Sequence, residues 1–254
     1  MKRSSGVRVA ATFFVSALSL ALVTGCGGDS GGSDAKALSA AELKKSIIAQ
    51  GDVEGYQVDA GGKQLPKSKD QVKSDDEKCA PLGYAMGGRA PGEAASETAV
   101  MVTQEKKKPT DNPSKSIEDL TEGEIEDSLT SAMDMTLTVV GLSSYDGDGA
   151  ENTFKSVSDA VKSCSAGFPV TMQGTDQKVT AIAAEKGSGS GDESVGFTVK
   201  SDAEDGDVAT SHVEVVRHGS TIATYYTMNL GLMITDKPYD VPAAVIDAQA
   251  AKLK

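Results

Sequence analysis

The chain has 254 residues, of which 24% are charged, and its formal net charge is −12. Nucleic acids bind proteins through Lys and Arg at their phosphates, so a chain this acidic is a poor match and we expect no nucleic-acid partner. Trp is absent and aromatic residues make up only 4% of the chain, so the hydrophobic core must consist mainly of aliphatic side chains and Met.

The first 25 residues have the pattern of an export signal. A basic start is followed by an apolar stretch over residues 9–23, which is short for a transmembrane helix. The stretch leads to Cys26 in the run LVTGC, which resembles the lipobox of bacterial lipoprotein signals. We therefore predict a lipoprotein signal peptide over 1–25. The alternative is an ordinary cleaved signal that happens to precede a cysteine.

A lipidated Cys26 would be the membrane anchor. The resemblance implies a diacylglycerol on its sulfur, with fatty acyl chains such as palmitate, and stable anchoring requires two or more such chains. Residues 26–37 are rich in Gly, Ser and Asp, which predicts a flexible tether. We therefore expect the protein on the extracytoplasmic face of the cell membrane.

The remaining two cysteines are Cys79 and Cys164. In an oxidising compartment we expect them to form a disulfide, with two free thiols as the alternative. A pair so far apart in sequence also indicates that the chain between them belongs to one domain.

The first half of the domain combines helices with isolated strands. Ser39 and Glu42 form a capping box, which predicts a helix that ends near Gly51. Further elements are predicted from apolar spacing: a turn that enters a short strand over 53–58, loops over 59–78, a loop or short helix over 83–96, strands over 98–104 and 135–142, helical segments over 116–132, and a helix over 153–163.

The last third is rich in alternating strands. They are predicted over 169–172, 178–184, 194–200, 208–217 and 221–230, and a helix over 241–253 closes the chain. His218 and Gly219 fit a two-residue hairpin turn. Together these elements predict an α+β fold over 38–254: one domain, with an antiparallel sheet of five to seven strands, helices packed on one side and one disulfide.

Residues for catalysis are scarce. His212 and His218 are the two histidines, which nearly excludes a His-based triad or a multi-histidine zinc site. If both lay on one strand, they would share a face with Glu214 and could form a weak metal site. The simpler interpretation is that His218 is a surface residue in a turn. The Gly/Ser run over 187–191 has Gly where a nucleophilic Ser belongs, so we interpret it as a flexible loop. We predict no catalytic residue, no cofactor and no metal site.

Asp146 and Asp148 begin a Gly/Asp run that is similar to a calcium-binding loop. The match fails at the fifth position, Ala150, and at the twelfth, Val157. We therefore predict a turn that leads into a helix, with a loose calcium contact at Asp146 and Asp148 as the open alternative.

Several short runs carry a family resemblance. They are GDVEGY at 51–56, CAPL at 79–82, Phe154 with AVKSC at 160–164, and the ending at 241–253. On these the chain resembles surface lipoproteins of high-GC Gram-positive (actinobacterial) bacteria and, more remotely, the extracellular sensor domain of the mycobacterial PknH-type kinases. The resemblance implies the fold class, no catalysis and an unidentified ligand. That sensor domain has two disulfides and this chain can form one, so no binding residue is carried over.

These patterns leave three classes of function. The first is a lipid-anchored, non-catalytic domain, monomeric and sensor-like, that binds a small ligand or a surface protein. The second is a carrier of lipid or another hydrophobic ligand, which would need an apolar cavity between the sheet and its helices. The third, less favoured, is a hydrolase that uses two carboxylates, as glycosidases do.

Overall fold

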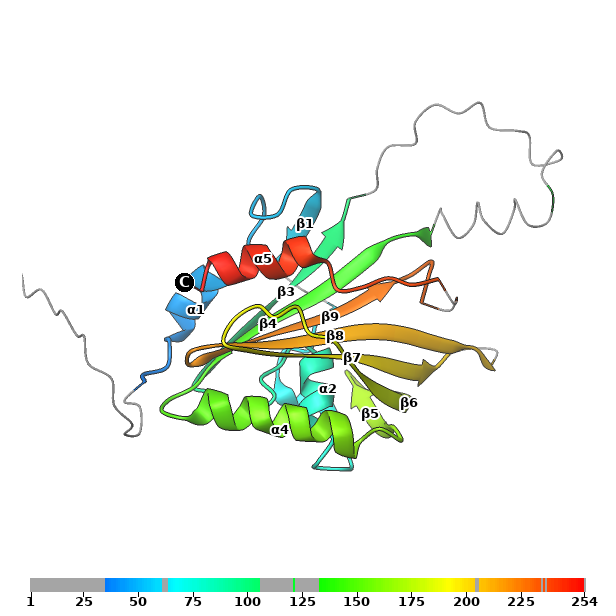
Figure 1. Ribbon diagram of the computed structural model, residues 1–254, viewed down its shortest axis with the longest axis horizontal. Coiled ribbons are helices and arrows are strands. Elements are labelled where there is room, and N and C mark those ends of the chain that lie inside the picture. Colours follow the sequence, from blue (N-terminus) through cyan, green and yellow to red (C-terminus); the bar gives the residue numbers. More distant parts are fainter. Residues whose placement is uncertain are drawn as a thin grey trace, which may run out of the picture. The chain divides into compact units, whose positions relative to one another are not determined.

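The structure is a computed structural model that describes residues 35–60, 64–105, 121, 133–203, 206–233, 235 and 237–253 (Figure 1). The predicted signal peptide, Cys26 and most of the predicted tether lie outside the described residues. So do most of the predicted helical segments over 116–132.

Nine strands form a single antiparallel sheet in the order β1-β3-β4-β9-β8-β7-β6-β5-β2. Their bounds are β1 Tyr56–Asp59, β2 Val72–Ser74, β3 Ser96–Gln104, β4 Thr136–Ser144, β5 Phe168–Met172, β6 Thr175–Glu185, β7 Glu193–Asp202, β8 Val208–His218 and β9 Thr221–Asn229. Strands β5 to β9 are sequential neighbours, and β9 then pairs with β4.

The predicted count of five to seven strands is too low. Strand β2 lies in the segment 59–78, where the sequence predicted loops, and it has only three residues. A strand this short shows no alternation that could reveal it. It exists because its backbone pairs with β5, a partner about 100 residues away, which sequence periodicity does not report.

Helices cover both faces of the sheet, so the prediction of helices on one side is wrong (Figure 1). The helices are α1 Ala40–Ser46, α2 Ala80–Met86, α4 Gly149–Ser163 and α5 Ala243–Ala251, with one 3-10 turn, η1 Lys69–Gln71. Val215 on β8 packs in one hydrophobic core with α2 and α4, whereas its neighbour Val216 packs in the other with α1 and α5. Successive strand residues point to opposite faces, so an apolar run such as this needs a cover on each side. We call these the α2/α4 face and the α1/α5 face.

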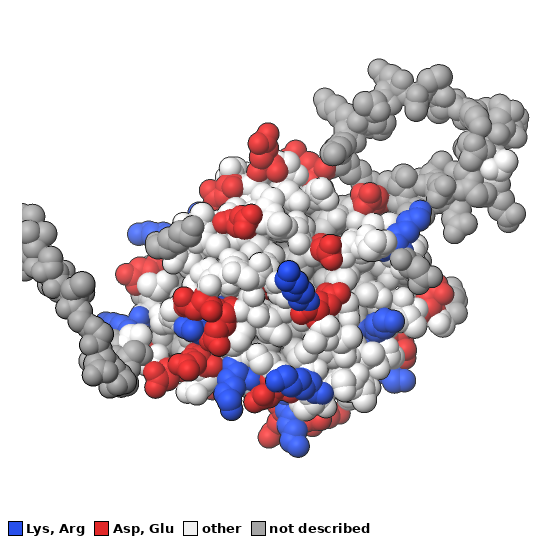
Figure 2. All heavy atoms as spheres, viewed as in Figure 1, with Lys and Arg blue, Asp and Glu red and all other residues white. Residues whose placement is uncertain are grey.

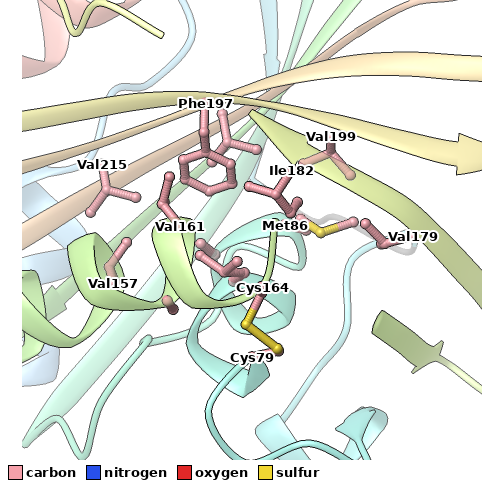
Figure 3. Packing of buried hydrophobic residues seen from close by; sticks show 14 of the residues in the cluster. Cys79, Met86, Val157, Val161, Cys164, Val179, Ile182, Phe197, Val199 and Val215 are labelled. Atoms are coloured by element: carbon pink, nitrogen blue, oxygen red, sulfur yellow. A yellow bond between two sulfur atoms is a disulfide. The ribbon is translucent and has the colours of Figure 1, made fainter. Parts of the chain in front are cut away.

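The two helices on the α2/α4 face are joined by the predicted disulfide. Cys79 is the N-cap residue of α2 and Cys164 is the C-cap residue of α4, and their sulfurs are bonded at 2.04 Å. Figure 3 shows the bond beneath a core of aliphatic side chains and Phe197 from the sheet. The disulfide therefore links two helices that pack on the same face of the sheet.

Local signals placed several element ends. The capping box at Ser39 and Glu42 is present and begins α1. The helix predicted over 153–163 starts earlier, at Gly149. The two-residue turn between β8 and β9 consists of Gly219 and Ser220 rather than His218 and Gly219, and Gly219 has a φ of 55°, a conformation that Gly adopts at little cost.

On the α1/α5 face one buried amide joins the two helices. The side chain of Gln249 on α5 is fully buried. Its Oε1 accepts the Ile48 N–H at 3.0 Å, and its Nε2 donates to the Ser46 carbonyl at 2.8 Å. These groups lie at the end of α1, where backbone groups have no partner within the helix.

We expect Gln249→Leu to lower the free energy of unfolding by about 1–3 kcal/mol, because a buried N–H loses its partner while the side-chain volume changes little. Urea unfolding followed by circular dichroism would measure it. Gln177→Leu, the same exchange at an exposed position on β6, is the control and should change stability by less than about 0.5 kcal/mol. Equal effects of the two exchanges would contradict the role of Gln249.

Candidate functional site

The helix cover of the α2/α4 face stops partway along the central strands. After α2 the chain turns at Gly88 (φ 65°), and a Cβ there would lie 2.6 Å from Cγ1 of Val139 on β4. A Cβ on Gly141 would lie 2.7 Å from the Gly88 carbonyl oxygen. These glycines let the backbone after α2 approach the sheet closely, so Val139 marks the end of the covered surface among the described residues.

Beyond Val139 the strands continue without that cover. The next residues on the α2/α4 face are Leu137 on β4 and Met135, just before β4; Leu230, just after β9, is beside Met135, and Met101 on β3 is opposite Val139. All four side chains are half-buried. Alternation in strands normally places such residues against a core. Here they form an apolar floor that remains partly exposed.

This floor lies in a hollow with a volume of about 1030 Å³, open to solvent, which we call the sheet-end hollow. Its lining residues come from the segment after α1, from β1, β3 and β4, and from residues just after β1 and β3, just before β4 and just after β9: Gln50, Gln57, Val58, Asp59, Gln64, Met101, Thr103, Glu105, Met135, Leu137 and Leu230. Residues 106–120 and 122–132, which follow Glu105 in sequence, lie outside the described residues.

Gln50 shapes one wall of the hollow. Its Oε1 accepts the Val58 N–H at 2.8 Å, and its Nε2 donates to the Tyr56 carbonyl at 3.5 Å. The amide thereby takes the place of a further strand beside β1, the edge strand of the sheet. Because the Gln50 amide occupies these backbone hydrogen-bonding groups of β1, this edge of the sheet is less available for pairing with another chain.

The described lining carries two carboxylates, Asp59 and Glu105, and no Lys or Arg. Elsewhere, acidic and basic side chains are interspersed over the face shown in Figure 2. Asp59 is opposite Met101 in the β1–β3 register, four positions from Glu105. Four strand positions span about 13 Å, which is wider than the roughly 5–9.5 Å between the carboxyl groups of a glycosidase pair.

The structure does not bring together the metal arrangement that was the less favoured alternative for the two histidines. His212 and His218 lie on one strand, six residues and therefore about 20 Å apart. The His212 Nδ1 is 3.0 Å from Glu185 Oε2, and its ring contacts the Tyr239 ring edge-on at 4.6 Å between centroids. Burial raises the pKa of Tyr239 to about 12, so its hydroxyl stays protonated and donates to the Thr210 carbonyl.

Glu214, between the two histidines, has a structural partner. Its Oε1 accepts hydrogen bonds from the Ser188 N–H, at 2.7 Å, and from the Ser188 hydroxyl. Gly196 on β7 gives room for this contact, because a Cβ there would lie 3.3 Å from the Lys186 carbonyl oxygen. The Gly/Ser run over 187–191, which we interpreted as a flexible loop, is therefore held against the sheet at Ser188.

Asp146 binds the start of the domain. Its Oδ1 accepts the Ala37 N–H at 2.9 Å, and the next residue, Gly147, donates its N–H to the Ala35 carbonyl at 2.7 Å. Asp148 is the N-cap residue of α4, as the predicted turn into a helix requires. Within the described part of the chain, no group of three or more His, Cys, Asp or Glu residues could hold a metal ion.

The floor of the hollow was not predicted from the sequence. The strands that carry Met101 and Leu137 were predicted, but which part of each strand lacks a helix cover depends on where α2 ends in space. One signal was available: Met135 and Leu137 stand two apart in the strand predicted over 135–142, a spacing that puts both on one face of a strand.

Comparisons with known proteins give a remote likeness. Neither a protein-family model nor a curated protein matches the chain. Among solved structures, the chain is similar to the crystal structure of the extracellular domain of PknH from Mycobacterium tuberculosis. The two are 10% identical, with a TM-score of 0.47, and the match covers 86% of this chain and 95% of that domain. The sequence predicted a remote resemblance to the extracellular domain of PknH-type kinases, and the comparison finds a remote similarity to such a domain.

No helix among the described residues combines the length and the apolar character needed to cross a membrane.

Proposed function

We propose that this protein is a lipid-anchored, extracytoplasmic binding domain without enzymatic activity, and that it holds a small amphipathic ligand in the sheet-end hollow. The observation that carries the proposal is the half-exposed apolar floor where the helix cover stops. Apolar surface removed from water contributes roughly 25 cal/mol per Å², so an apolar group placed on this floor would be stabilised.

The lining suggests the chemistry of the ligand. Its apolar part would contact Met101, Met135 and Leu137, and the flexible Met side chains adapt to different shapes. The amide groups of Gln57 and Gln64 supply donors and acceptors at the rim. Because the charged groups of the described lining are carboxylates, a neutral or cationic head group fits better than an anionic one.

The hollow and the point where the chain enters the domain lie at different ends of β3. The chain enters the domain at Ala35–Leu38, where the Leu38 carbonyl accepts the Ser96 hydroxyl at 2.7 Å. Ser96 begins β3 and Gln104 ends it near the hollow, a span of about 26 Å. The point where the chain enters the domain is therefore remote from the hollow.

The alternative of a lipid carrier with an enclosed cavity receives less support. That cavity would lie between the sheet and a helix layer. The layer on each face instead packs through its own cluster of buried side chains, with Val157 and Phe197 in one and Leu43 and Val245 in the other. The carboxylate hydrolase is disfavoured by the separation of Asp59 from Glu105.

The test uses the neutral apolar dye Nile red as a probe of the floor. We expect the full-length chain to enhance the fluorescence of the dye in a saturable manner and Leu137→Asp to weaken binding tenfold or more, because the ligand would have to desolvate a carboxylate. Native mass spectrometry of the protein from its host would then identify a co-purified ligand.

Val208→Asp is the matched control. Val208 is an exposed apolar residue outside the hollow, with 46% of its surface accessible, and this exchange should leave dye binding unchanged. Circular dichroism would verify that both variants fold. The proposal fails if the unaltered chain does not bind the dye, or if the two variants bind it equally well.

A further inference from the structure

The pairing of neighbouring strands sorts the lining of the sheet-end hollow by polarity. Strands β1, β3 and β4 lie side by side (Figure 1). Gln57 on β1 is opposite Thr103 on β3, and Thr103 is opposite Leu137 on β4. All three residues line the hollow, and we call them the cross-strand row. Neighbouring strands are about 4.8 Å apart, so the row changes from polar to apolar over about 10 Å.

The residues around the row follow the same division. On the β4 side, the lining consists of Leu137, Met135 and Leu230, whose side chains are apolar and half-buried. The β1 and β3 side carries a set of polar lining residues: Gln57, Asp59, Thr103 and Glu105. The apolar exception there is Met101, since the Val58 side chain packs against the core of the opposite face. The hollow therefore has an apolar half and a mainly polar half.

The two polar residues of the row can reach a ligand. Gln57 is exposed and Thr103 is half-buried. Within the described part of the chain, no other protein group forms a hydrogen bond with either side chain, whereas the Gln50 amide is already bonded to the β1 backbone. An amide and a hydroxyl each offer both a donor and an acceptor, so a matching head group must itself donate and accept.

Two carboxylates flank the row on its polar side. Asp59 is two positions after Gln57 and Glu105 is two positions after Thr103, and because the strands are antiparallel these residues lie on opposite sides of the row. A carboxylate accepts hydrogen bonds and repels an anionic head group. An ammonium group only donates, so it could not accept from the Gln57 amide. Hydroxyl groups do both, so a neutral head group with several hydroxyls matches this half of the hollow.

We propose that the hollow binds a neutral amphiphile whose head group carries several hydroxyl groups, as a sugar does. Its head lies over Gln57 and Thr103, and its apolar tail lies across β4 over Leu137 and Met135. This inference rests on the proposed function, because it uses the same hollow, and it assigns the class of the ligand and its direction across the strands. Gln57 and Thr103 are the residues that select the head group.

The test uses probes that share one octyl tail and differ in the head group: octyl glucoside, octyl sulfate and octyltrimethylammonium. Each would be titrated into the full-length chain by calorimetry, below its critical micelle concentration. We expect octyl glucoside to bind about tenfold more tightly than octyl sulfate, because like charges in contact oppose binding. It should also bind about threefold more tightly than octyltrimethylammonium, which forms no hydrogen bond. Glucose without a tail should bind far more weakly than octyl glucoside.

The variant Gln57→Leu/Thr103→Val removes the polar groups of the row and keeps its volume nearly constant. We expect octyl glucoside to bind about tenfold more weakly, because two hydrogen bonds are lost. Nile red should bind as tightly as before or more tightly, because the floor becomes more apolar. The matched control is Gln177→Leu/Thr175→Val, at two exposed positions on β6 outside the hollow; it should leave the binding of both probes unchanged. Circular dichroism would verify that both variants fold.

The outcomes separate this inference from the proposed function. A chain that binds neither Nile red nor octyl glucoside overturns both. If Nile red binds but a charged probe binds as tightly as octyl glucoside, this inference alone is wrong. The same holds if Gln57→Leu/Thr103→Val leaves octyl glucoside binding unchanged, or weakens the binding of both probes equally. Glucose that binds as tightly as octyl glucoside would show a site for free sugar and overturn the amphiphile.

Discussion

Cys79→Ala/Cys164→Ala should unfold about 10–15 °C below the disulfide-bonded chain. The disulfide closes a loop of 85 residues in sequence separation. In the chain-entropy model, a loop of this length contributes about 4–5 kcal/mol by restricting the unfolded chain. For a domain of roughly 200 residues, each kcal/mol shifts the melting temperature by about 2–4 °C.

The structure adds a native-state contribution to this effect. Both cysteines are almost inaccessible, at 2% and 3% of their surface, and each lies at a helix end in the core of the α2/α4 face. Removing the two sulfurs leaves a small cavity in this core, which also contains Leu82 and Phe168, and cavities in a packed core lower stability further.

Differential scanning calorimetry with and without reductant would measure the effect. Reductant should lower the melting temperature of the parent chain toward that of the double variant and leave the double variant unchanged. Two thiols that titrate in the folded parent without reductant would contradict the disulfide, and a shift below about 3 °C would contradict its energetic role.

Cys26→Ala should move nearly all of the protein from the membrane fraction to the medium or the soluble envelope fraction. Each methylene group of an acyl chain that enters the bilayer contributes about 0.8 kcal/mol, so the loss of two chains removes the whole anchor. Cell fractionation followed by immunoblotting would measure the distribution.

Gly27→Ala is the matched control, since it changes the neighbouring residue and leaves the sulfur in place; it should remain with the membrane. Mass spectrometry of the N-terminal peptide should find the lipid on Cys26 in the parent chain. If the parent chain itself were found in the medium, the ordinary cleaved signal would be correct. Retention of Cys26→Ala at the membrane would show a different anchor.

Local sequence patterns predicted individual helices and strands better than they predicted which faces of the sheet the helices cover. The capping box at Ser39 is local, since it needs only the four residues to Glu42, and it was correct. The Cys79–Cys164 pair was also predicted, because an oxidising compartment and two remaining cysteines leave few choices. Strand β2 could not be predicted, since its three residues become a strand only by pairing with β5.

By itself, the sequence determined the features that depend on residue identity and short spacing. These are the α+β class, most of the strands, the disulfide and the scarcity of catalytic residues. The tertiary structure decided how the strands are covered. The apolar run on β8 does not indicate whether helices pack on one face of the sheet or on both. The Met and Leu residues of the hollow alternate along their strands in the same way as fully buried residues do. Among the described residues, the chain after α2 packs on Val139, which is buried, whereas Leu137, the next β4 residue on that face, is half-buried. That boundary depends on packing between segments distant in sequence.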